Sequence, residues 1–275
     1  MPELREVFEM VTKQTEPDVD AWRDQERRQY RKSRNRKLGA LAIAAAIGIV
    51  AVVVVARAAD KGTGTQPGGR PSDTTELPTD QSTPPLPSGS VEPGRYVFTS
   101  YDPGLDASHR ITIDVPEGYV GVDGLGALKS GFSQTGVATM AIGDVYADPC
   151  QWEGTQLDRS QISSADGLAA ALATQQGVRV STPTDVTVAG FAGTYMERRV
   201  PARMVSSDCD SDQFRVYRVP EWGGRYLEPG QLQRLWVLDV DGVPLVIDAS
   251  IQTGASTGIL VELLQMVESV RIDPR

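Results

Sequence analysis

The chain has 275 residues, with 36 acidic and 27 basic side chains and a formal net charge of −9. Most of the acidic excess lies in residues 58–275, where 28 acidic and 16 basic residues give a net charge of −12. Binding of DNA or RNA depends on Lys and Arg contacts to phosphate, so a chain this acidic is not expected to bind nucleic acid. The acidic surface instead favours solubility.

The first 37 residues form a tail that is too short to bury a core of its own. Within it, four apolar side chains recur at helical spacing and predict one apolar helix stripe: Leu4, Val7, Phe8 and Val11. A short helix of this kind gains stability when its apolar stripe is covered. The stripe fits either a helix lying along lipid headgroups or a docking helix for a cytosolic protein partner.

A run of nineteen residues, Leu38–Ala56, carries no charge and no proline. As a helix it would span roughly 28 Å, close to the thickness of the hydrocarbon core of a bilayer. The run therefore predicts a single transmembrane helix, assigned to residues 38–59, that inserts in the lipid bilayer. A cleaved signal peptide is the alternative, since Ala56-Arg57-Ala58 resembles a cleavage site, but the run exceeds the usual apolar region of about 7–15 residues.

The residues before the apolar run indicate its orientation. Eight basic side chains and two acidic ones lie between positions 23 and 37. Basic flanks stay on the cytoplasmic side, so the N-terminus is expected inside and the C-terminal domain outside. The predicted location is the cell membrane, with residues 1–37 as a cytoplasmic tail and an extracytoplasmic domain beyond the span.

Residues 60–94 are rich in Pro, Gly, Thr and Ser and contain no aromatic residue. Such a segment cannot bury enough apolar surface to offset its chain entropy, so it predicts a disordered linker. The linker would hold a folded domain away from the membrane. Its composition also suits O-glycosylation.

Residues 95–275 have the length of one domain. Short apolar segments separated by turn residues predict a mainly antiparallel sheet, with hairpin turns at Ala189-Gly190 and Asp241-Gly242. Strict alternation in one segment predicts a strand with one buried face. The predicted strands are Tyr96–Tyr101, Ile111–Val115, Val137–Val145, Val186–Val188, Gly193–Val200, Phe214–Val219, Leu235–Val240 and Pro244–Ile251.

Two helices are predicted in the same domain. Asp166–Gln176 follows an N-cap at Ser163 or Ser164 and stops at Gly177. Ser256–Val270 carries its leucines and valines on one stripe. The predicted fold class is α+β: an antiparallel sheet with two helices on one face, preceded by a single transmembrane helix and a disordered linker.

Cys150 and Cys209 are the only cysteines of the chain, and both belong to the part expected outside the cytoplasm. In an oxidising compartment such a pair predicts a disulfide, worth roughly 4 kcal/mol in the chain-entropy model. A nucleophilic or redox cysteine is the alternative, but the chain has no C-x-x-C motif.

His109 is the only histidine, and it is expected in an exposed or half-exposed loop. A catalytic dyad with Ser108 or Ser133 remains open, although no G-x-S-x-G motif supports it. Two cysteines and one histidine supply too few ligands for a zinc site. No catalytic, metal-binding or cofactor-binding residue is assigned.

Three aspartates near Cys209 imitate the start of a calcium-binding loop, but Val219 stands where such a loop needs its bidentate Glu. They are therefore interpreted as solvated loop charges: Asp208, Asp210 and Asp212.

Two glycine-containing segments are further candidates for binding sites. Gly121, Gly124 and Gly126 follow a possible strand but lack the spacing and lysine of a phosphate-binding loop. Trp222 precedes two further glycines and fits an exposed loop, although large aromatic side chains are more often part of a core.

The order of opening strands, helix, strand meander and closing helix resembles the Mog1/PsbP-like fold. The whole chain resembles uncharacterised single-pass membrane proteins of actinobacteria, which share a tail of the kind LREVFEMVTKQTEPDVDAWRDQ, a basic juxtamembrane stretch, an Ala/Val-rich span and a Pro/Thr linker. Some relatives with such tails are encoded near sigma factors, so the resemblance implies a role in envelope signalling. It implies no activity.

We therefore expect a membrane-anchored envelope protein with an extracytoplasmic binding or sensory domain, and not an enzyme. An envelope hydrolase and a structural domain near the cell wall are the alternatives. A pocket lined by convergent titratable side chains would favour the enzyme, whereas a filled core under a flat acidic surface would exclude it.

Overall fold

The computed structural model describes residues 83–275. The predicted tail (1–37), the predicted transmembrane helix (38–59) and the predicted linker up to residue 82 lie outside the described residues, and with them the apolar stripe of the tail. Within residues 83–275, no helix combines the length and the apolar character that crossing a membrane requires.

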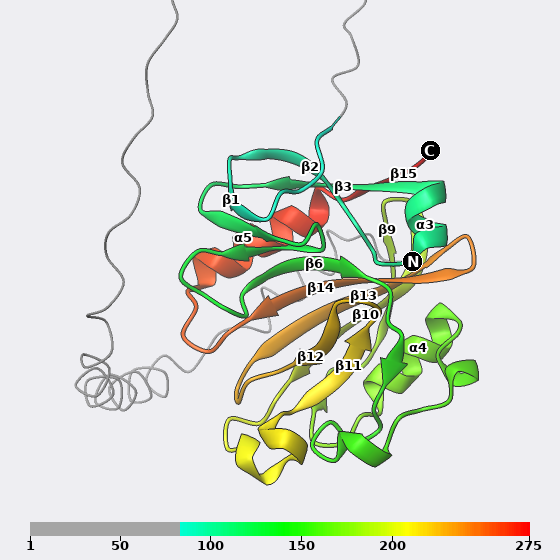
Figure 1. The fold of residues 1–275 in the computed structure, drawn as a ribbon, viewed down its shortest axis with the longest axis vertical. Helices are drawn as coiled ribbons and strands as arrows, with labels where there is room; N and C mark the ends of the chain where they lie inside the picture. The colour runs from blue at the N-terminus through cyan, green and yellow to red at the C-terminus, as the bar shows by residue number, and fades with distance from the viewer. Residues whose placement is uncertain (1–82) are drawn as a thin grey trace, which may run out of the picture. The chain divides into compact units, whose positions relative to one another are not determined.

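An antiparallel sheet of nine strands runs through the described domain (Figure 1). Its order is β1-β4-β5-β6-β14-β13-β10-β8, and β9 pairs with β10 beside this path. The strands are β1 (Gly89–Val91), β4 (Tyr119–Val122), β5 (Gly126–Lys129), β6 (Gly136–Met140), β8 (Arg179–Val180), β9 (Thr184–Val188), β10 (Phe191–Arg199), β13 (Leu232–Val240) and β14 (Val243–Ile251).

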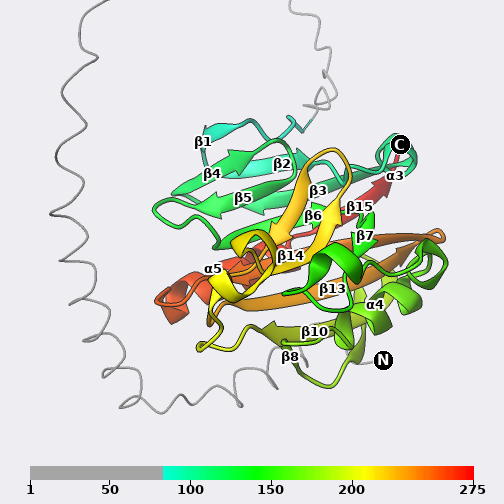
Figure 2. The same cartoon turned by 60° about the horizontal axis from the view of Figure 1, so that its bottom comes forward.

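Two three-stranded sheets accompany this main sheet in the described part of the chain. One has the order β12-β11-β7 and the other β15-β3-β2. In Figure 2 the hairpin of β11 and β12, drawn in yellow, crosses in front of the main sheet. The bounds are β2 (Gly94–Phe98), β3 (His109–Val115), β7 (Asp144–Val145), β11 (Arg215–Val219), β12 (Gly223–Tyr226) and β15 (Arg271–Pro274).

The three α-helices among the described residues all begin at a side-chain cap. The caps are Asp102, Ser164 and Ser256, and each side chain accepts a backbone N–H of the first turn. The helices are α3 (Pro103–Ser108), α4 (Ala165–Ala173) and α5 (Thr257–Glu268), and the short 3₁₀ segments are η1 (Trp152–Gly154), η2 (Arg159–Gln161), η3 (Ser206–Asp208) and η4 (Asp210–Asp212).

The central hairpin of β13 and β14 buries side chains on both faces of the main sheet. Because successive side chains of a strand point to opposite faces, Trp236 and Ile247 join one hydrophobic cluster, and Val237 and Val246 join the other. The residues of α5 belong to the first cluster and those of α4 to the second. The two helices therefore cover opposite faces, as Figure 1 also shows.

The predicted single sheet with two helices on one face is therefore wrong. The described domain has three sheets and a third helix, α3, and α4 and α5 lie on opposite faces. The physical reason is the pattern of Leu232–Val240, in which six consecutive residues are buried. A strand that is apolar on both sides needs a cover on both sides.

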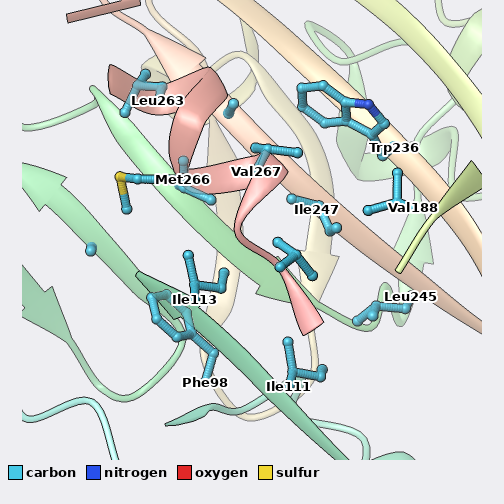
Figure 3. Packing of buried hydrophobic residues seen from close by; sticks show 14 of the residues in the cluster. Phe98, Ile111, Ile113, Val188, Trp236, Leu245, Ile247, Leu263, Met266 and Val267 are labelled. Carbon is cyan, nitrogen blue, oxygen red and sulfur yellow. The ribbon is translucent and has the colours of Figure 1, made fainter. Parts of the chain in front are cut away.

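The first cluster is an apolar interior shared by the main sheet, α5 and the sheet β15-β3-β2. Burial of each such Leu, Ile or Phe side chain stabilises the fold by about 1.5–3 kcal/mol. Figure 3 shows the contributors from β2 and β3 (Phe98, Ile111, Ile113), from β13 and β14 (Trp236, Leu245, Ile247) and from α5 (Leu263, Met266, Val267).

Both predicted hairpin turns are present. Val188 pairs with Phe191 and Val240 pairs with Val243, so each connection has two residues. The turn residues have positive φ values of 52° and 89° at Ala189-Gly190, and of 51° and 86° at Asp241-Gly242. This backbone matches the type I′ turn that two-residue hairpins favour.

The predicted linker extends too far along the chain, because residues 83–94 belong to the folded domain. Leu86 and Val91 are buried in the first cluster, β1 pairs with β4, and Pro85 bridges to Val97. The composition of residues 60–94 as a whole does not distinguish these few apolar side chains from the polar residues around them.

Candidate functional site

A pocket of about 190 Å³ opens between the main sheet and the β11–β12 hairpin. It lies on the face that carries α4, since Leu125 and Met140 of its wall belong to the second cluster. Most of the wall is apolar, and polar side chains gather at one end. The residues that line the pocket include Leu128, Ala138, Trp222, Gln134, Arg225 and Ser250.

Small residues on β5 and β6 create the hollow. Gly126 lies opposite Ala138 in the ladder, and a Cβ added to Gly126 would lie 2.9 Å from the Ala138 Cβ. A Cβ on Gly136 would lie 2.2 Å from the Ala127 carbonyl oxygen. Larger side chains are therefore excluded from this part of the sheet, which leaves space beneath the hairpin.

Trp222 forms the outer lip of the pocket at the tip of the β11–β12 hairpin. The backbone N–H of Trp222 donates to the Pro220 carbonyl at 2.6 Å, across a tight turn in which Glu221 has a φ of 61°. Gly223 follows with a φ of 115°, which only glycine adopts readily. The side chain is 37% exposed although it lines the pocket. Of the two alternatives left open by the sequence, a core position and an exposed loop, Trp222 has the exposed one.

Arg225, on β12, forms the polar end of the pocket together with two residues of β14. Its Nε lies 3.3 Å from the Asp248 carboxylate, and its Nη2 donates to the Ser250 hydroxyl at 2.7 Å. Ser250 in turn donates to Asp248 at 2.6 Å. The Arg225 Nη1 donates to the side-chain oxygen of Gln134, in the loop before β6. The same Nη1 also donates to the Tyr226 carbonyl at 3.2 Å, so Arg225 is held by one charged and three neutral acceptors.

Asp248 has further donors behind this layer. Tyr217 and Gln233 donate to its Oδ2 at 2.8 Å and 2.7 Å, and the Asp248 side chain is 2% exposed. Burial raises the pKa of Tyr217 well above its ordinary value, and the charge of Asp248 raises it further. This phenol therefore stays neutral. Burial lowers the pKa of Arg225, but Asp248 more than offsets this and the pKa is raised.

Arg198 is a second buried guanidinium on the same face of the sheet. It pairs across the ladder with Gln233 and is fully buried. Its Nη2 donates to Gln175, whereas its Nε and Nη1, like the Oε1 of Gln233, have no hydrogen-bond partner within the described part of the chain. Burial lowers the pKa of Arg198 to about 10, so the group stays charged at neutral pH.

The predicted disulfide is confirmed. Cys150 and Cys209 are bonded at an S–S distance of 2.07 Å and join the loop after β7 to the loop before β11. The loops make further contacts beside it: Trp152 donates to the Asp210 carbonyl at 3.0 Å, and the Arg215 guanidinium stacks 4.0 Å from the Trp152 ring. The bond thereby fixes the base of the hairpin that forms the pocket.

The expectation of an exposed loop for His109 is wrong, because this residue opens β3 and is 6% exposed. Its ring packs edge-on against Phe191 with centroids 5.9 Å apart. Its Nδ1 lies 2.9 Å from the Ser108 hydroxyl and its Nε2 lies 3.2 Å from the Asp241 carboxylate. The three residue types are those of a hydrolase triad, but the two ring nitrogens are exchanged, since in such a triad the serine faces Nε2 and the carboxylate faces Nδ1.

Two features of this triad-like arrangement weaken a catalytic interpretation. The Ser108 hydroxyl donates to the Gly104 carbonyl at 2.9 Å, at the C-terminal end of α3. Helix C-termini carry partial negative charge, which disfavours an oxyanion beside this serine. The other candidate, Ser133, lines the pocket instead and is not brought to His109.

The three aspartates around Cys209 have a structural role in their loop. The Asp210 carboxylate accepts the Glu153 N–H at 2.9 Å, and η3 and η4 contain all three residues. Residues 83–275 contain no group of three or more His, Cys, Asp or Glu side chains arranged to hold a metal ion.

The glycine pattern Gly121, Gly124 and Gly126 forms the β4–β5 hairpin, where Val122 pairs with Gly126. A Cβ on Gly121 would lie 1.9 Å from the Pro87 carbonyl oxygen, so this glycine permits close approach of two backbones.

The chain matches no protein-family model and no curated protein sequence. The resemblance to the Mog1/PsbP-like fold and to membrane proteins of actinobacteria stays a prediction. The pocket and its polar end are therefore the features that bear on function.

The polar end of the pocket was not predicted from the sequence. One signal was present, since Asp248 interrupts the apolar alternation of its strand. Its partners Arg225, Gln233 and Tyr217 come from three other strands, and no local spacing connects them to it.

Proposed function

We propose that the protein is a membrane-anchored envelope protein whose domain, residues 83–275, binds a small ligand in the pocket under Trp222. The single observation that carries the proposal is the combination of an apolar pocket of about 190 Å³ with a buried polar network at one end. Apolar walls with a few convergent polar groups are typical of small-molecule sites. The ligand site would serve a binding or sensory role and not catalysis.

Two observations support the location. The apolar run Leu38–Ala56, with its basic N-terminal flank, supports a membrane anchor with the C-terminal domain outside. The Cys150–Cys209 disulfide is consistent with an oxidising compartment. We expect alkaline phosphatase fused after Arg275 to be active in cells. An inactive fusion, together with a fluorescent cytosolic reporter at the same position, would contradict the location.

The binding function is tested by recovering the ligand. The full chain is purified from its own cells in mild detergent and denatured, and released small molecules are measured by mass spectrometry. We expect one or more masses that are lost in Ala138→Leu, which fills the pocket. Ala192→Leu makes the same change at an exposed strand position and should retain them. Identical profiles for wild type and Ala138→Leu would contradict the proposal.

A second candidate function, an envelope hydrolase, is favoured by the Ser108–His109–Asp241 arrangement alone. A fluorophosphonate probe tests it, because the probe labels serines that a histidine activates. Labelling of the wild type that is lost in Ser108→Ala would establish the hydrolase. We expect no Ser108-dependent labelling, since the Ser108 hydroxyl already donates to a backbone carbonyl at the end of α3.

A further inference from the structure

We propose that the pocket selects a small organic anion, with its carboxylate or similar group on Arg225 and its apolar body under Trp222. This inference rests on the proposed function and deepens it by naming the class of ligand. It is carried by three features of the described residues: the charge balance of the buried network, the way Arg225 is held, and the size and lining of the pocket.

The buried network contains more positive than negative charge. Arg225 forms an ion pair with Asp248 at 3.3 Å, whereas the fully buried Arg198 forms no ion pair within the described residues, and Asp248 is the carboxylate whose charge acts on both. Tyr217, the remaining titratable member, is neutral at physiological pH. Two guanidinium groups therefore share one carboxylate. Buried charge without a counter-charge is costly, so an anion that enters next to this network improves its balance.

Arg225 and Asp248 both line the pocket, and Arg225 is the more exposed of the two, since the Asp248 side chain is 2% exposed. The Arg225 side chain is 12% exposed, whereas Arg198 is fully buried. One Arg225 nitrogen donates to Gln134, a neutral side chain of the loop before β6 that also lines the pocket. A ligand carboxylate in place of the Gln134 oxygen would convert a neutral hydrogen bond into a charge-assisted one.

The rest of the pocket suits an apolar body of modest size. Apolar cavities of roughly 150 Å³ take a benzene-sized molecule, and this pocket has about 190 Å³. The wall consists mainly of aliphatic side chains of β5 and β6, with the Trp222 indole at the entrance. A ring or short chain with one terminal anion would place its polar end at Arg225 and its apolar end against Leu128 and Trp222.

The test compares three probes that share one apolar body and differ in charge: 3-phenylpropanoate, 3-phenylpropan-1-ol and 3-phenylpropylammonium. Their affinities for the full chain in lipid nanodiscs are measured by calorimetry, and only binding that Ala138→Leu abolishes is counted. We expect the anion to bind at least about tenfold tighter than the alcohol, the advantage of a charge-assisted hydrogen bond, and the ammonium to bind most weakly.

A paired variant isolates the role of Arg225. Arg225→Met with Asp248→Asn removes one positive and one negative charge together, so the net charge of the network is unchanged and Arg198 remains as its charged member. The anion should lose its advantage over the alcohol, and retained alcohol binding shows that the pocket is still formed. If this variant loses alcohol binding, Arg225→Lys is compared instead. Its anion advantage should fall below about threefold, because one ammonium cannot keep the Asp248 and Ser250 contacts and also donate to the ligand as the guanidinium does.

The outcomes separate this inference from the proposed function. Equal affinities of the three probes, or tightest binding of the alcohol or ammonium, would overturn the anion proposal while the pocket stands. Binding that Ala138→Leu leaves unchanged would overturn the pocket itself, and with it the proposed function. An anion advantage that persists in both Arg225 variants would also overturn the assignment of the carboxylate to Arg225.

Discussion

The two faces of the main sheet bury side chains of different character although they share the same strands. On the face toward α5, the residues of β13 and β14 meet an apolar interior formed with β2 and β3 (Figure 3), and the buried Arg234 of this face pairs with Glu197 at 2.7 Å. On the face toward α4, the same hairpin carries Gln233, Asp248 and Ser250 at buried positions and meets the β11–β12 hairpin across a pocket.

This difference indicates a division of roles. An apolar interior that is closed on all sides contributes stability and offers no access to a ligand. Buried polar groups contribute little net stability, and each unmatched one costs free energy. The α4 face combines such groups with a pocket that they line, which stability alone does not explain, and we attribute this combination to binding.

The largest effect on stability is expected from the disulfide, which joins two loops beside the β11–β12 hairpin of the α4 face. Replacing Cys150 and Cys209 by serine should lower the free energy of unfolding by about 4 kcal/mol, since the bond closes a loop of 59 residues. Urea denaturation of the full chain in nanodiscs measures this. A loss below about 1 kcal/mol would show that the two loops stay in place without the bond.

The closed and open faces can be compared directly by truncation. Ile247→Ala on the α5 face should cost about 3.5 kcal/mol, because a fully buried side chain leaves a cavity. Leu128→Ala in the pocket wall, which is half-buried, should cost less than about 1 kcal/mol. Urea denaturation compares the two. Equal losses would mean that the pocket wall is as closed as the core.

The polar network can be broken at its one carboxylate. Asp248→Asn should cost about 3 kcal/mol, since it leaves Arg225 and Arg198 without a negative partner. Asp185→Asn is the matched control on an exposed strand position and should change stability by less than about 0.5 kcal/mol. A stability gain in Asp248→Asn would show that the carboxylate, and not the arginines, is the uncompensated charge.

The smallest effect on stability is expected at the lip of the pocket. Trp222→Ala should change the free energy of unfolding by less than about 0.5 kcal/mol, because the side chain is 37% exposed. The same variant should weaken 3-phenylpropanoate binding at least about tenfold, since indole contact with an apolar ring is lost. A stability loss with unchanged binding would place Trp222 in the core and not in the site.

Local sequence signals predicted both hairpin turns and the longer strands, but they missed β1, β4, β5, β8, β12 and β15 and merged β6 with β7. Asp241-Gly242 and Ala189-Gly190 specify their turns through positive φ values, and Ser164 specifies its helix start through a side-chain cap. These features depend on neighbours in the chain. The cysteine pair also succeeded, because two cysteines in a domain expected outside the cytoplasm allow one intramolecular bond.

Non-local features were not predictable in the same way. The buried run in Leu232–Val240 indicates two covered faces, but it does not indicate which helix covers which face. The pocket depends on small residues, Gly126 and Ala138, that face a hairpin about ninety residues further along the chain. His109 was misplaced because its burial depends on Phe191 and Asp241, which are distant in sequence.

The most direct test of the central claim is a nuclear magnetic resonance titration of the full chain with 3-phenylpropanoate. Trp222→Phe assigns the Trp222 indole signal, and Arg225→Lys assigns the Arg225 Nε–H signal. We predict that both signals shift together on titration, whereas the indole signal of Trp236, buried on the α5 face, stays unchanged. Saturating shifts elsewhere, with Trp222 and Arg225 unmoved, would contradict the account.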